Sequence, residues 1–149
     1  MANVFDVAKY VIEREGKNGC MSTMRLQKLC YYCQAWSLVW DGVPLFPEDF
    51  KAWANGPMCR PLYKKTEGMF SVTPEDETGG EGNLTDNQID SINIALDYYS
   101  GRDAQWLCSL SKMEAPWFEA RQRALTGDNP FPIISKESML AYYSTLEDS

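Results

Sequence analysis

The stretch from Met24 to Trp40 constrains the fold most, because its apolar residues recur at intervals of three and four. That spacing is the period of an α-helix, and it is too long and too regular for a strand. The apolar arc is wide, which predicts a helix at the centre of the fold rather than on its surface. The apolar positions are Met24, Leu26, Leu29, Cys30, Cys33, Trp36, Val39 and Trp40.

Polar and aromatic side chains fill the rest of this predicted helix. Tyr31 falls away from the Leu29 and Cys33 stripe, so we expect it to be exposed and free to contact a partner. Gln27, Lys28 and Gln34 are expected on solvated or partner-facing arcs.

Helical spacing also predicts helices over residues 4–15, 58–65, 85–99, 103–110, 116–124 and 135–146. Pro57 is expected in the first turn of the short helix 58–65. Residues 50–54 favour a strand, paired with residues near Leu45 or Val72. We therefore predict a mainly α fold over residues 1–149. It is a single compact domain of about six or seven helices, with a small β element near residues 44–54 and 70–73.

The chain is acidic, with 14 basic and 21 acidic residues and a formal charge of −7. An acidic surface repels phosphate, so no nucleic-acid partner is expected, although a local patch at Arg25 and Lys28 stays possible. The net charge favours a basic protein partner. Residues 74–83 form an acidic, glycine-rich loop, interpreted either as a solvated linker or as an arm that meets such a partner.

Catalytic chemistry is poorly represented. The chain has no histidine, which removes the usual nucleophile pairs and most transition-metal sites. Cys30 and Cys33 have C-x-x-C spacing, but a zinc site needs a second ligand pair, so core packing is the favoured interpretation over metal or redox chemistry. No cofactor motif, signal peptide or membrane span is recognised. We expect a cytoplasmic protein with reduced thiols and no cofactor.

Several short motifs follow one another in a specific order. They are Val7-Ala8-Lys9-Tyr10-Val11-Ile12, Leu26-Gln27-Lys28-Leu29-Cys30-Tyr31-Tyr32 with Ala35-Trp36, Pro44-Leu45-Phe46, Phe50-x-Ala52-Trp53-x-x-Gly56-Pro57 with Pro61 and Tyr63, and Glu114-x-Pro116-Trp117-x-x-Ala120-Arg121. This series resembles the Panacea antitoxin domain of SocA-type antitoxins and of phage-associated, GepA-like proteins. The resemblance covers most of residues 4 to 124. Members of that family usually carry a Thr-His pair where this chain has Ser111-Lys112, so no role of that histidine carries over.

The resemblance implies a non-enzymatic antitoxin that neutralises a protein toxin by direct contact. SocA-type members deliver their toxin to a ClpXP-type protease, so the resemblance leaves occlusion and proteolytic delivery both open. It also implies a prophage or other mobile-element context. The toxin's identity and the oligomeric state stay open.

The candidate partner-binding residues are Tyr31, Trp53, Asn55, Gly56, Pro57 and Tyr63, followed by Arg25 and Lys28. Trp53 beside a tight turn is typical of an interface anchor. One alternative is a small enzyme that uses carboxylates and tyrosine in a cleft near Trp53. Others are a phage counter-defence protein and a nucleic-acid-binding regulator.

Overall fold

The computed structural model describes residues 2–16, 20–73 and 83–147, so the acidic loop 74–83 lies outside the described residues apart from Asn83. Seven helices lie in the described part of the chain and account for most of it. They are α1 (Val4–Glu15), α2 (Thr23–Asp41), α3 (Arg60–Lys65), α4 (Asp86–Tyr99), α5 (Ala104–Met113), α6 (Ala115–Thr126) and α7 (Lys136–Glu147). The predicted mainly α fold is confirmed.

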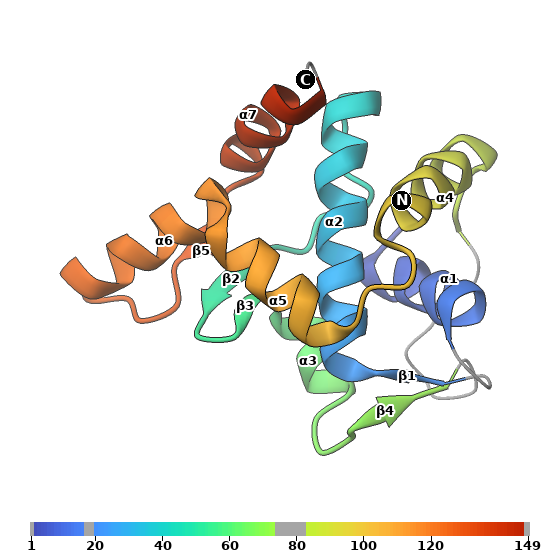
Figure 1. Ribbon diagram of the computed structural model, residues 1–149, viewed down its shortest axis with the longest axis horizontal. Helices are drawn as coiled ribbons and strands as arrows, with labels where there is room; N and C mark the ends of the chain where they lie inside the picture. The colour runs from blue at the N-terminus through green and yellow to red at the C-terminus, as the bar shows by residue number, and fades with distance from the viewer. Residues whose placement is uncertain (1, 17–19, 74–82, 148–149) are drawn as a thin grey trace.

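Helix α2 is the centre of the fold, as its wide apolar arc predicted. Helices α1, α4, α5 and α7 all pack against it, and Figure 1 shows it running through the middle of the molecule. Every residue from Leu26 to Leu38 is buried, polar ones included. A helix surrounded in this way has no solvated face, so its polar side chains must find hydrogen-bond partners inside the protein.

The helix boundaries follow local capping chemistry. Helix α4 begins with a capping box, in which Gln88 N donates to Thr85 Oγ1 and Thr85 N donates to Gln88 Oε1. Asp103 accepts from Trp106 N to begin α5. Ser135 Oγ accepts from Ser138 N at the start of α7. Each side chain satisfies an amide that the first turn of a helix leaves unpaired.

Five short strands form two small antiparallel sheets in the described residues. Strands β2 (Phe50–Trp53) and β3 (Gly56–Cys59) form a hairpin, and β5 (Ile133–Ile134) pairs with the other side of β2. Strand β1 (Met21–Ser22) pairs with β4 (Ser71–Val72).

The predicted partners of the strand at 50–54 were wrong, because β2 pairs with residues 56–59 and 133–134. Val72 pairs with Met21 instead. Pro57 was also misplaced, since it lies in β3 and helix α3 begins only at Arg60. Strand β3 is at the edge of its sheet, where a residue without an N–H is tolerated.

Candidate functional site

The β2–β3 hairpin brings several predicted site residues together. Trp53 ends β2 and is paired across the hairpin with Gly56 at the start of β3. The two residues between them, Ala54 and Asn55, are exposed and form the turn. Tyr63 of α3 packs edge-on against Trp53, with ring centroids 5.0 Å apart. The aromatic ring of Phe131 approaches Trp53 from the segment before β5, at 5.6 Å. The hairpin tip therefore carries an aromatic cluster beside an exposed turn.

Gly56 is the residue that lets the hairpin form here. Its φ of +108° is one that L side chains rarely adopt. A Cβ at this position would also lie 3.0 Å from Lys28 Cε and 3.1 Å from Ser111 Oγ. Gly56 thus serves the close approach of the hairpin to α2 and α5 and is itself buried.

Helix α2 holds the hairpin through two polar side chains. The Gln27 amide pairs with Cys59, accepting from its N–H at 2.8 Å and donating to its carbonyl at 3.1 Å. Lys28 Nζ donates to the carbonyl of Pro57 at 2.9 Å. The Gln34 amide forms a similar pair of hydrogen bonds with the loop before the hairpin, accepting from Leu45 N and donating to the carbonyl of Phe46.

The expectation that Gln27, Lys28 and Gln34 face solvent or a partner was wrong, because all three are buried. Their polar ends form hydrogen bonds with main-chain groups of the hairpin and of the loop before it, and these bonds take the place of hydrogen bonds to water. The local patch at Arg25 and Lys28 that the sequence left possible is not formed, because Lys28 is buried and its Nζ donates to the carbonyl of Pro57.

Lys28 occupies an unusual electrostatic position. Besides the Pro57 carbonyl, its hydrogen-bond partners are the sulfurs of Met24 and Met58, each at 3.4 Å. Burial lowers the pKa of Lys28 to about 8, an effect that the nearby Cys108 thiol partly offsets. The charged form thus has one carbonyl and two weakly accepting sulfurs as hydrogen-bond partners in a buried environment.

Helix α6 holds the opposite side of the hairpin. Trp117 Nε1 donates to the carbonyl of Trp53 at 2.9 Å, and Arg121 Nη1 donates to the carbonyl of Ala52 at 3.0 Å. Both acceptors are main-chain atoms of β2. The Glu114-x-Pro116-Trp117-x-x-Ala120-Arg121 motif therefore fixes the backbone of the Phe50-x-Ala52-Trp53 motif.

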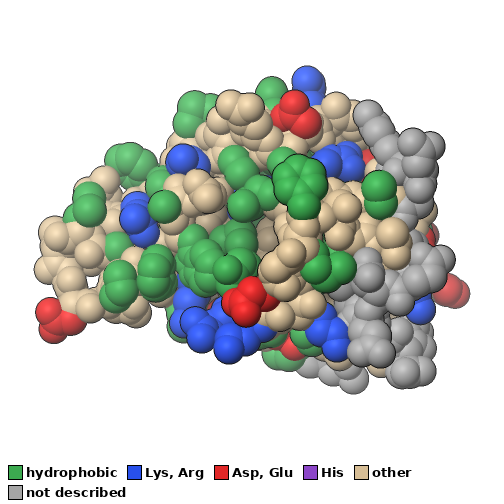
Figure 2. Space-filling view, turned by 90° about the horizontal axis from the view of Figure 1, so that it is seen from below, with side chains coloured by type: hydrophobic (Ala, Val, Ile, Leu, Met, Phe, Trp, Pro, Cys, Tyr) green, Lys and Arg blue, Asp and Glu red, His purple; other side chains and the backbone are tan. Residues whose placement is uncertain are grey.

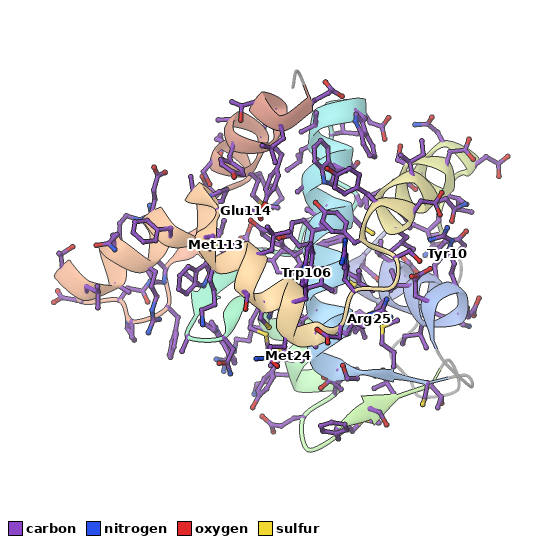
Figure 3. All side chains as sticks on the ribbon, viewed as in Figure 1. Tyr10, Met24, Arg25, Trp106, Met113 and Glu114 are labelled. Carbon is purple, nitrogen blue, oxygen red and sulfur yellow. The ribbon has the colours of Figure 1, made fainter. Side chains whose placement is uncertain are left out.

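Glu114 begins the same motif and joins three parts of the fold. Its Oε1 accepts from Tyr32 at 2.7 Å and from Tyr143 of α7 at 2.8 Å. The hydroxyls of Tyr143 and Tyr31 are also hydrogen-bonded to each other, at 3.2 Å. Burial raises the pKa of the Glu114 carboxyl, and hydrogen bonds from Tyr32 and Tyr143 partly oppose that rise. Figure 3 shows Glu114 at the junction of α5 and α6.

Tyr31 was predicted to be exposed, and this was wrong because its side chain is fully buried. It packs edge-on against Phe50 at 5.2 Å and against Tyr32 at 5.3 Å. Since α7 covers this side of α2, Tyr31 is part of the core and is not available for a partner.

Arg25 lies apart from the hairpin. Its guanidinium donates to the carbonyl of Arg102 at 2.8 Å and pairs with Glu15 at 3.5 Å. Figure 3 shows it beside the loop that leads into α5. Arg25 lines a pocket of about 740 Å³. Two carboxylates also line this pocket: Glu15 forms ion pairs with Arg14 and Arg25, and Asp103 accepts from Trp106 N at the start of α5. The pocket's lining does not include Trp53 or Glu114, so it offers no support for a cleft enzyme at the hairpin.

Cys30 and Cys33 are buried core residues, as the sequence indicated. Burial raises the pKa of the Cys33 thiol to about 12 and that of Cys30 well above its usual value. Within the described residues, no group of histidine, cysteine or carboxylate side chains has a geometry that would hold a metal ion.

Basic residues around the hairpin were missed as site candidates. Lys51 lies in β2 on the same side as Trp53, opposite buried Phe50 and Ala52. Arg60 and Lys64 of α3 are exposed and lie one turn apart, beside Tyr63. We call this surface the basic–aromatic face; it consists of Lys51, Trp53, Arg60, Tyr63, Lys64, Phe131 and Ile133. Figure 2 looks at the side of α3 and β4 and shows basic side chains bordering a broad apolar area.

A signal for this face is present in the sequence. Residues 50–65 contain four basic residues and no acidic one, although the chain as a whole is acidic. Charge counted over long segments hides this run, whereas a short window reveals it.

Comparison with known protein families gives one match. Residues 26–118 match the model of the antitoxin SocA-like family, the Panacea domain, and this range is more than half of the chain. The chain belongs to the SocA-like Panacea family. No curated protein and no solved structure matched.

The Panacea match places the hairpin and most of its anchors inside the family region. Gln27, Lys28, Gly56 and Trp117 lie within residues 26–118, whereas Arg121 and helix α7 lie beyond it. The Ser111-Lys112 departure falls next to the hairpin. Ser111 Oγ donates to the carbonyl of Cys108, and Lys112 Nζ lies 5.9 Å from the ring centre of Trp117.

Membership of an antitoxin family supports an antitoxin role and indicates a protein partner. In the described part of the chain, no helix combines the length and the apolar character needed to cross a membrane.

Proposed function

We propose that this protein is a non-enzymatic antitoxin that neutralises a protein toxin by direct contact through the basic–aromatic face. The observation that carries the proposal is the convergence of Panacea motif residues on the hairpin backbone. Lys28 and Gln27 hold β3, and Trp117 and Arg121 hold β2. A rigid hairpin loses little conformational freedom when a partner binds.

The exposed part of the hairpin supports the same proposal. Asn55 and Ala54 are exposed at the turn, and Trp53 and Tyr63 are only partly buried. Aromatic side chains that are already ordered by their neighbours are typical anchors of protein interfaces. Gly56 and Pro57 are buried, so they act by shaping the hairpin and not by touching the toxin.

Co-expression tests the proposal. Each toxin candidate encoded beside this protein is expressed in a bacterial host with wild-type protein, and growth is measured. Wild type should restore growth, and the double variant Trp53→Ala/Tyr63→Ala should not. Tyr98→Ala removes an equally aromatic, 77% exposed side chain from α4 and should restore growth like wild type.

Two results would contradict the proposal in different ways. Toxins that stay lethal beside the wild-type protein would remove the antitoxin function. Full rescue by Trp53→Ala/Tyr63→Ala, with the variant folded by circular dichroism, would move the contact surface elsewhere. Measuring toxin half-life in hosts with and without a ClpXP-type protease separates occlusion from proteolytic delivery.

A further inference from the structure

The basic–aromatic face differs in charge from the rest of the molecule. Because residues 50–65 contribute +4 to a total of −7, the remainder of the chain carries −11. Salt screens exposed charges over about 8–10 Å at physiological ionic strength. A partner seated on this face therefore meets the three cations Lys51, Arg60 and Lys64, and one exposed carboxylate, Glu67, follows α3.

The aromatic part of the face carries an unmet hydrogen-bond donor. Trp53 Nε1 is buried and has no acceptor among the described residues. An unpaired buried donor costs about 1–3 kcal/mol, and proteins keep few of them. A partner that supplies carboxylate oxygens near Trp53 would match the surrounding cations, and it would reach this donor once the Trp53 side chain rotates outward.

Apolar area is also available beside these charges. Phe131 is 44% exposed and Ile133, the Cα partner of Lys51, is 46% exposed. The face thus offers an apolar strip bordered by cations, which fits a segment with both acidic and apolar side chains.

We infer that the basic–aromatic face binds an acidic segment of a partner protein, with apolar side chains set against Trp53, Phe131 and Ile133. This inference rests on the proposed function and names the chemistry of its partner. It reverses the expectation of a basic toxin, which followed from net charge alone. A nucleic acid is the poorer fit, because its phosphates extend beyond three cations and the rest of the chain has a formal charge of −11.

Selection from a random peptide library displayed on phage tests the inference without knowledge of the toxin. Wild-type protein is the bait, and peptides that also bind the folded Trp53→Ala/Tyr63→Ala variant are removed. The remaining peptides should contain more Asp and Glu than Lys and Arg. Enrichment of basic or neutral peptides, or no peptides that depend on these aromatic residues, would overturn the inference.

Charge reversal then tests the best selected peptide, synthesised with a fluorescent label. Lys64→Glu should weaken its binding about fivefold. Lys9→Glu on α1 changes the net charge by the same amount and should weaken binding by less than about twofold, since α1 is remote from the face. Equal effects of the two variants would mean that net charge, and not this face, governs binding.

A single-stranded uridine oligonucleotide is the second probe. If it binds more tightly than the selected peptide and loses binding in Lys64→Glu, a nucleic acid and not a protein segment occupies the face. The selection reports which chemistry the face recognises, whereas co-expression reports neutralisation. Failure of one is therefore distinct from failure of the other.

Discussion

Gly56 meets two constraints at once, a φ of +108° and a Cβ position only 3.0 Å from Lys28 Cε. Gly56→Ala should therefore lower the free energy of unfolding by about 2–3 kcal/mol, measured by urea denaturation. Gly101→Ala is the matched control, because Gly101 has a φ of +81° and an added Cβ there would meet nothing within 4 Å. It should cost about 1 kcal/mol. Equal costs for both variants would show that close packing at Gly56 adds nothing.

Lys28 makes a prediction about pH. Its folded pKa of about 8 is lower than the 10.5 of an unfolded lysine, so the unfolded chain binds more protons between those values. Stability contributed by this residue therefore rises as pH increases. Relative to Lys28→Met, wild type should gain about 2 kcal/mol between about pH 7 and about pH 9.5.

The comparison with Lys28→Met removes the effect of other groups. Burial raises the pKa of the Cys33 and Cys59 thiols to about 12, which lowers stability as alkaline pH deprotonates the unfolded chain. Both proteins share that loss. If the difference in stability between wild type and Lys28→Met stays constant with pH, the pKa of Lys28 is not lowered by burial.

At the scale of elements, the hairpin depends on α6. Trp117→Phe keeps an aromatic ring but removes the donor to the Trp53 carbonyl. It should cost about 1–2 kcal/mol and speed hydrogen exchange of the β2 amides. Trp106→Phe alters a 42% exposed side chain on α5 and should leave hairpin exchange unchanged. Unchanged exchange in Trp117→Phe would show that other contacts hold β2.

The helices were predictable from sequence because each has a local signal. Helix α1 was expected over residues 4–15 and spans Val4–Glu15, and the helix expected over residues 135–146 spans Lys136–Glu147. Such signals depend only on nearby residues. Strand β5 has no such local signal, because its partner β2 lies more than 80 positions away in the sequence.

The candidate site was only partly predictable for the same reason. The tight turn after Trp53 was predictable because a turn after a strand is a local feature, and Asn55 is exposed in it, whereas contact of Trp53, Asn55 and Tyr63 with a partner stays a prediction. Tyr31 and Lys28 were misassigned, since local spacing does not show that α5, α7 and the hairpin cover every side of α2. Polar residues on a fully surrounded helix turn inward and bind main-chain groups.

At the scale of the whole molecule, α7 lies beyond the matched family region and yet completes the core. Tyr143 is fully buried and bonded to Glu114 and Tyr31. Tyr143→Ala should cost about 3–5 kcal/mol in one cooperative transition, measured by thermal and urea unfolding. Tyr142→Ala, on the half-buried neighbouring position, should cost far less. Two separate transitions in wild type would contradict the proposal of a single domain over residues 1–149.

The anchors of the hairpin grip carbonyl and amide groups, and these are the same whatever side chain a residue carries. Replacements at Ala54, Asn55 or Lys51 would therefore leave the grip intact. Proteins with this fold can therefore change their binding partner through substitutions at the hairpin tip, while the contacts that hold the hairpin backbone stay the same.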